Sequence, residues 1–162
     1  MMTTGKMMIK TNTTKIIYFI TCFVFFIIVD LYLSNLLVRA MAHGLHFNTP
    51  VLKLHYLENT GAAFNILRDA REALIIFSAS AITLLFVYVI NNLQKLSTMS
   101  LFWIALLCAG TFGNMHERIA IGCVRDFFEL TFVNFPVFNI SDIMINVSVI
   151  ALVIIILFKK VK

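Results

Sequence analysis

Apolar residues gather in four long runs along the chain. These runs cover residues 16–38, 73–90, 99–115 and 140–158. An α-helix needs about 20 predominantly apolar residues to cross the hydrocarbon core of a bilayer, and each run is close to that length. The pattern therefore predicts four membrane-spanning helices that form a single membrane domain over residues 1–162.

Two polar segments separate these runs, at residues 39–72 and 116–139, and the first has a pattern of its own. From Leu52 to Tyr56, apolar and polar residues alternate, which is typical of a β-strand with one buried face. Gly61 marks a bend after this strand. We therefore predict an all-α membrane protein with a small β-rich segment outside the bilayer.

The composition supports the membrane assignment and excludes other classes of protein. Of the 162 residues, 60% are hydrophobic and 13% are charged, against roughly a quarter charged in an average soluble domain. A soluble domain of this length could not bury so many apolar side chains, and a disordered chain would be far more polar. The net charge of +5 comes without a basic groove interleaved with aromatic residues, so we expect no binding to nucleic acid.

Charged residues are distributed unevenly between the two ends of the expected helices. The terminal segments and the link at residues 91–100 carry seven basic residues and no acid, whereas all eight acids fall on the other side. The seven are Lys6, Lys10, Lys15, Lys95, Lys159, Lys160 and Lys162. Because short cytoplasmic segments are enriched in Lys and Arg, we expect both termini in the cytoplasm and any chemistry near the outer face of the membrane.

Two of the acids are candidates for catalysis. Asp142 begins the fourth apolar run, and Asp126 lies in the polar segment before it. Two carboxyl groups that approach each other in a low-dielectric site cannot both ionise easily, so the pair can act as acid and base, as in aspartic proteases. The alternatives remain open: Asp142 is a helix-start acid favoured by the helix dipole, and Asp126 pairs with Arg125 or Arg118.

Several polar residues flank these acids. Asn59 and Gly61 form a polar turn, which is either a plain turn or a loop that returns to the membrane and contacts a substrate. Asn114 and Arg118 lie near the outer end of the third run, where polar groups need partners. Asn139 precedes the second acid by three residues, so both side chains can face one site.

The order of these motifs resembles the lipoprotein signal peptidases, also called signal peptidase II, which are small four-span aspartyl proteases of bacteria. The resemblance covers almost the whole chain. The matching runs are Asn59-Thr60-Gly61-Ala62-Ala63-Phe64 with N-x-G-A-A-F, Gly113-Asn114 and Arg118 with G-N-x-x-D-R, Val124-Arg125-Asp126-Phe127 with V-V-D-F, Phe138-Asn139-Ile140-Ser141-Asp142 with F-N-x-A-D, and Asp30 with the acid of the first helix.

The resemblance implies a role for each matched residue. Asp126 and Asp142 would be the catalytic pair, with no metal or other cofactor. The residues that hold the substrate or support the pair would be Asn59, Gly61, Asn114, Arg118 and Asn139. Asp30 and Glu117 would give structural support. The segment at residues 39–72 would correspond to an extracytoplasmic β-rich cradle over the site.

The resemblance also implies a substrate and a location. The enzyme would remove the signal peptide of diacylglyceryl-modified prolipoproteins by cutting just before the lipidated cysteine. It would lie in the phospholipid bilayer of the bacterial inner membrane as a multi-pass protein. The cyclic peptide antibiotic globomycin blocks such enzymes, so we expect it to bind here. We expect a monomer.

Three departures from the family pattern keep an alternative open. Ser34 stands where the family has a lysine, Glu117 where it has an aspartate, and Ser141 where it has an alanine. These changes affect supporting residues and leave the catalytic groups intact. The alternative is a catalytically weak relative, or a non-enzymatic small membrane binding protein.

Overall fold

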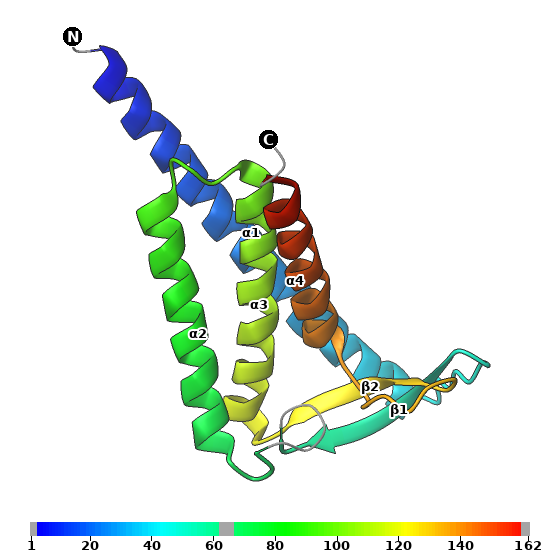
Figure 1. Cartoon of the computed structure of the whole chain (residues 1–162). Helices are drawn as coiled ribbons and strands as arrows, with labels where there is room; N and C mark the ends of the chain where they lie inside the picture. Colours follow the sequence, from blue (N-terminus) through cyan, green and yellow to red (C-terminus); the bar gives the residue numbers. More distant parts are fainter. Residues whose placement is uncertain (1–2, 62–66, 160–162) are drawn as a thin grey trace.

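The computed structural model describes residues 3–61 and 67–159 of the chain (Figure 1). Ala62, Ala63 and Phe64 of the sequence motif lie outside this part. The elements follow the order α1 (Thr3–Ala42), β1 (Leu52–Asn59), α2 (Arg71–Asn92), α3 (Thr98–Ile121), β2 (Val124–Leu130) and α4 (Ile140–Lys159). A mainly helical membrane protein with a small sheet is therefore confirmed.

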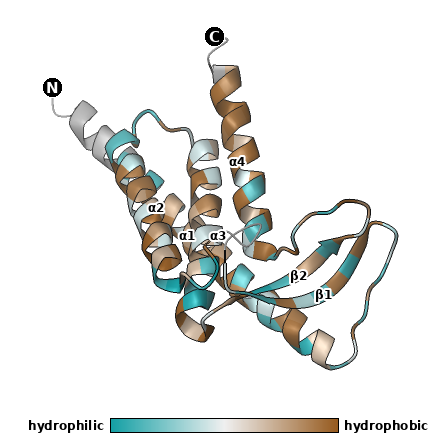
Figure 2. Cartoon of the chain, turned by 60° about the horizontal axis from the view of Figure 1, so that its bottom comes forward, coloured by the Kyte–Doolittle hydropathy of each residue, from teal (hydrophilic) through white to brown (hydrophobic). Residues whose placement is uncertain are grey.

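All four helices are long and apolar enough to cross a membrane, over Asn12–Ala42, Arg71–Asn92, Thr98–Ile121 and Ile140–Phe158. Hydrophobic residues predominate along the helices (Figure 2). Many of their large apolar side chains are exposed, as expected for helices that face lipid.

The third helix continues six residues beyond the end that hydropathy predicts. It ends at Gly122, which has a φ of +87°. Its backbone N–H bonds to the Arg118 carbonyl at 3.2 Å, and glycine adopts this left-handed conformation without steric cost. Glu117 and Arg118 therefore lie on α3 instead of in the following polar segment.

Helix α3 packs at the centre of the bundle, between the other helices (Figure 1). Its buried side chains include Leu101, Ala105 and Cys108, which pack with Phe19 of α1 and Val89 of α2. On the side facing α4, a Cβ atom on Gly110 would lie 2.6 Å from the Ser141 carbonyl oxygen. Small residues at such positions let two helices approach closely in a membrane.

The two strands form an antiparallel sheet that projects from one end of the bundle (Figure 1). The strand expected from the alternation at Leu52 to Tyr56 is confirmed as β1. Strand β2 is not predicted by the sequence pattern, because its phenylalanines suggest a segment at the membrane interface. The register pairs Asn59 with Val124 and Leu57 with Asp126, which brings β1 against the first candidate acid.

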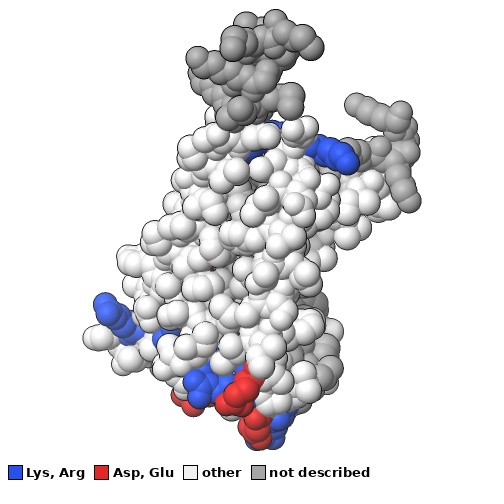
Figure 3. Space-filling view, turned by 90° about the vertical axis from the view of Figure 1, so that its left-hand side faces the viewer, with Lys and Arg blue, Asp and Glu red and all other residues white. Residues whose placement is uncertain are grey.

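Acidic side chains gather at the sheet end of the molecule, and the helical middle is almost free of charge (Figure 3). At the opposite end, Lys15 donates hydrogen bonds from Nζ to the carbonyls of Leu93 and Leu96, at 2.8 and 2.7 Å. The Leu93 carbonyl is at the C-terminal end of α2, where a cation is also favoured by the helix dipole, and the Leu96 carbonyl lies in the link to α3.

Candidate active site

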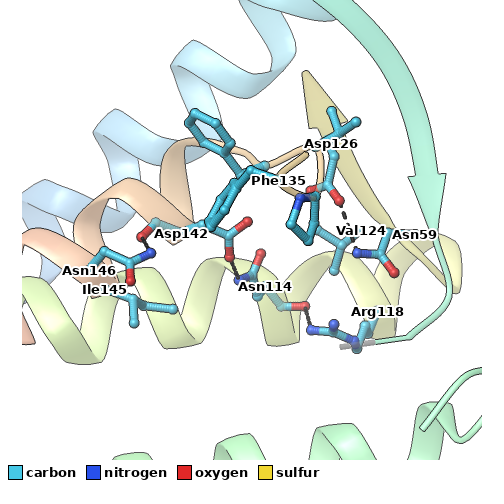
Figure 4. A pocket seen from close by; sticks show the side chains of 12 residues that line it. Asn59, Asn114, Arg118, Val124, Asp126, Phe135, Asp142, Ile145 and Asn146 are labelled. Carbon is cyan, nitrogen blue, oxygen red and sulfur yellow. Dashed lines mark hydrogen bonds between the residues drawn. The ribbon is translucent and has the colours of Figure 1, made fainter. Parts of the chain in front are cut away.

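A cavity of about 310 Å³ opens where α3, α4 and the sheet meet (Figure 4). Both candidate acids, Asp126 from β2 and Asp142 from α4, line it. A second hollow of about 510 Å³ continues from it over the sheet and shares Asn59 and Asp126 with it. The structure thus brings together two carboxyl groups that are sixteen residues apart in the sequence.

Asp126 is almost fully buried, with 1% of its surface exposed. Asn59 donates from Nδ2 to Asp126 Oδ2, and Asn139 donates from Nδ2 to Asp126 Oδ1, both at 2.9 Å. Burial raises the pKa of Asp126 to about 7. The negative charge of Asp142 acts in the same direction, while the two amide hydrogen bonds oppose it. Asp126 therefore has a carboxyl group that can hold a proton near neutral pH.

Asp142 is fixed by the first turn of α4. Its backbone N–H donates to Asn139 Oδ1 at 2.8 Å, and its Oδ2 accepts from the backbone N–H of Asn139 at 3.1 Å. This reciprocal pattern is a capping box, in which two otherwise unpaired donors of the helix start are satisfied. Asn114 donates from Nδ2 to Asp142 Oδ1 at 2.8 Å (Figure 4). The helix-start role considered from the sequence is thus observed, and it coexists with a position in the cavity wall.

Two asparagines link the acids, and we call them the amide relay: Asn114 and Asn139. Asn139 donates from Nδ2 to Asn114 Oδ1 at 3.0 Å, in addition to its bond to Asp126. A continuous series of hydrogen bonds therefore runs from Asp126 through the relay to Asp142. The amide orientations are fixed, because Asn139 Oδ1 accepts from the Asp142 backbone N–H, which leaves Asn139 Nδ2 to donate to Asn114 Oδ1.

Arg118 does not pair with either acid through a salt bridge within the part of the chain that the structure describes. Its Nη2 donates to the Gly61 carbonyl at 2.7 Å, and its Nη1 donates to the Asn114 carbonyl at 3.1 Å. The Gly61 N–H in turn donates to Asn59 Oδ1 at 2.9 Å. Arg118 thereby ties the polar turn to α3, and this turn aims the Asn59 amide at Asp126.

The partner of Arg125 is Glu117, and the alternative in which Arg125 pairs with Asp126 is not observed among the described residues. Glu117 Oε2 accepts from the Arg125 backbone N–H at 2.7 Å, and Oε1 accepts from Nε at 2.8 Å and from Nη2. Arg125 also donates from Nη1 to Asn35 Oδ1 at 3.2 Å. The longer acid at position 117 therefore forms a two-point contact that fixes the residue before Asp126.

Residues 135–138 form one wall of the cavity, and the sequence did not identify them as part of the site. The backbone N–H groups of Phe127 and Phe128 both donate to the Phe138 carbonyl at 2.9 Å. This pairing folds the loop before α4 back against β2. Pro136, which breaks the helical pattern ahead of the fourth run, was the available signal.

The arrangement suits acid–base chemistry on a bound water molecule. One buried and one partly buried carboxyl group in the same cavity can hold a proton on one side and accept a proton on the other. Among the described residues, no group of three or more His, Cys, Asp or Glu side chains could hold a metal ion.

Comparisons with known proteins agree with this picture. The model of the family described as signal peptidase (SPase) II matches residues 22–158. A lipoprotein signal peptidase of Campylobacter jejuni is 34% identical over 146 residues, covering 90% of each chain. One from Streptococcus thermophilus is 34% identical over 105 residues, covering 65% of this chain and 68% of the relative.

Solved structures of bacterial membrane enzymes have a similar fold. One bacterial membrane enzyme superposes with a TM-score of 0.76 at 28% identity and covers 88% of both chains. A second has a TM-score of 0.73 at 29% identity and covers 86% of this chain and 92% of its own.

Proposed function

The chain belongs to the signal peptidase II family, and from this membership we propose that it is an aspartyl endopeptidase with Asp126 and Asp142 as the catalytic pair. Family membership supports removal of signal peptides from lipoproteins, in a membrane environment. The observation that carries the mechanism is the position of two hydrogen-bonded carboxyl groups in the wall of one cavity, with Asp126 buried and Asp142 partly buried.

In the proposed reaction the pair shares one proton, which Asp126 holds in the resting state. Asp142 takes a proton from a water molecule as the water oxygen attacks the scissile carbonyl carbon. Asp126 donates its proton to the carbonyl oxygen, and a tetrahedral intermediate forms. Asp142 then gives its proton to the departing nitrogen as the C–N bond breaks, and Asp126 takes a proton from one hydroxyl group of the intermediate as the new carboxyl group forms. The pair thereby returns to its starting state.

The remaining polar residues would hold this geometry. Asn59, Asn114 and Asn139 donate to the carboxyl groups, and Arg118 fixes the turn at Gly61. Donors that are already oriented in a buried site need no reorganisation during the reaction. The hollow over the sheet offers room for the chain that follows the cut, with the cut just before the lipidated cysteine.

Four helices that can span a membrane, together with the family, fit a protein of the bacterial inner membrane. We further propose that both termini are cytoplasmic and that the cavity lies near the outer face. The acids at the sheet end (Figure 3) and the enrichment of the terminal segments and of residues 91–100 in lysine along the sequence support this orientation. We also propose that the enzyme acts as a monomer, and that a globomycin-type cyclic peptide occupies the cavity.

The test is cleavage of a diacylglyceryl-modified prolipoprotein by purified protein in lipid, with the product masses read by mass spectrometry. The proposal predicts a product that begins at the lipidated cysteine, and no product from the same precursor without the diacylglyceryl group. A folded protein that binds the precursor and leaves it intact would favour the non-enzymatic binding alternative instead.

A further inference from the structure

Three helices meet directly behind the start of α4. Ser141 donates a hydrogen bond from Oγ to Asp30 Oδ2 of α1 at 2.8 Å, and both side chains are at least 96% buried. Gly113 of α3 lies against this bond, and a Cβ atom there would overlap both Asp30 Oδ2 and Ser141 Oγ. The contact thus exists only because residue 113 has no side chain.

This contact is one residue away from a residue of the candidate site on each of two helices. Ser141 immediately precedes Asp142, and Gly113 immediately precedes Asn114. The hydrogen bond from Asn114 Nδ2 to Asp142 Oδ1 runs between these same two helices. Asp30 and Ser141 are absent from the cavity wall, so they can affect the reaction only through their neighbours.

Asp30 is buried although its carboxyl group is only partly satisfied by hydrogen bonds. Its Oδ1 atom is buried and has no hydrogen-bond partner among the described residues, and no salt bridge there reaches it. A carboxyl group with one donor is costly in a low-dielectric interior, whereas an apolar side chain of similar volume would pack there without that cost. Ser141 needs such an acceptor if its hydroxyl is to hold α4 in one orientation.

We propose that Asp30 is a positioning residue that acts through Ser141 to fix the rotation and height of the first turn of α4, and so the aim of Asp142. The inference rests on the proposed function. It explains why α1, which contributes nothing to the cavity wall, contains a buried acid at the level of the catalytic pair. A misplacement of about 1 Å at a catalytic group can lower a rate by about a hundredfold.

The experiment measures kcat and KM for Ser141→Ala, Asp30→Ala, Asp30→Asn and the Ser141→Ala/Asp30→Ala double variant. We expect each alanine variant to lower kcat by about tenfold or more while KM stays within about twofold. The double variant should be no slower than the slower single variant, because both lose one bond. Asp30→Asn keeps an oxygen that accepts from Ser141, so it should retain kcat within about threefold.

Ser148→Ala is the matched control. Ser148 is also buried on α4, but its hydroxyl donates to the carbonyls of Met144 and Ile145 in its own helix. Its removal should leave kcat unchanged, which separates a general effect of losing a buried serine from the effect at Ser141.

The inference would be overturned by a wild-type kcat in Ser141→Ala, by effects that multiply in the double variant, or by a rise in KM with unchanged kcat. A lower unfolding temperature with unchanged kcat would give the pair a structural role only, and would also overturn it. Cleavage by the wild-type protein is established first, so failure of the proposed function is seen before any variant is tested. If Asp30→Ala fails to fold, Ser141→Ala and Asp30→Asn decide the outcome.

Discussion

Asn139 donates a hydrogen bond to Asp126 at 2.9 Å while it caps the helix that carries the other acid. Its Oδ1 atom accepts from the backbone N–H of Asp142, and its Nδ2 atom reaches Asp126 Oδ1. This side chain, which is 3% exposed, therefore links β2 directly to the start of α4. It acts together with the backbone pairing of Phe127 and Phe128 with Phe138.

Replacement of Asn139 separates these two roles. Serine also caps helices well, so Asn139→Ser should preserve stability, but its short side chain cannot reach Asp126. We expect kcat to fall by about a hundredfold with little change in unfolding temperature. Asn139→Ala should lower kcat similarly and also cost about 1 kcal/mol of stability through loss of the cap. Equal activity of Asn139→Ser and the wild type would show that the relay does not position the pair.

The raised pKa of Asp126 predicts how stability depends on pH. The folded protein binds this proton more tightly than the unfolded chain, because the pKa rises from 3.8 to about 7 on folding. The resulting stabilisation is fully present below about pH 4 and is lost as pH rises through about 7, by about 4 kcal/mol over the whole window.

Asp126→Asn stays neutral throughout and lacks this dependence. Thermal unfolding from pH 5 to pH 8 should therefore show the variant becoming more stable relative to the wild type as pH rises. Parallel curves for the two proteins would contradict a raised pKa at Asp126.

The sequence predicted the fold because lipid imposes a simple pattern. Four runs of the required length and one alternating segment were enough to find the helices and β1. The hydrophobic pattern did not predict β2. Its phenylalanines pack against Phe138 and against Tyr56 of β1, and contacts with residues distant in the sequence produce no alternating pattern within the strand itself. The end of α3 was missed because polar Glu117 and Arg118 interrupt the hydropathy while remaining helical.

The candidate residues were found by motif, but their partners were not. One alternative from the sequence paired Asp126 with an arginine, whereas Arg125 binds Glu117 and Arg118 binds backbone carbonyls. These pairings depend on the α3–β2 connection, in which the left-handed Gly122 turns the chain. Ser141, which stands where the family has an alanine, had no role that the sequence could indicate. The structure shows that its hydroxyl donates to Asp30.

The two-point contact of Glu117 predicts that its length matters. Glu117→Asp is one methylene shorter and cannot reach both the backbone and the guanidinium of Arg125. We expect a loss of about 2 kcal/mol, since hydrogen bonds to buried charged groups are lost. Glu129→Asp is the matched control, because Glu129 forms an exposed salt bridge with Lys53 on the same sheet. Its unfolding temperature should not change, and equal losses in the two variants would contradict the special role of Glu117.

We propose that Asp126 and Asp142 together hydrolyse the substrate. The most direct measurement compares cleavage of the diacylglyceryl-modified precursor by the wild type, Asp126→Asn and Asp142→Asn, with folding checked by thermal unfolding. Asp69→Asn is the control, because Asp69 is an exposed acid outside the cavity, and its left-handed backbone also suits asparagine. We expect wild-type turnover in the control. Turnover should fall by at least about a thousandfold in Asp126→Asn and in Asp142→Asn, provided that each variant folds. Turnover within about tenfold of the wild type in either dyad variant would contradict the claim.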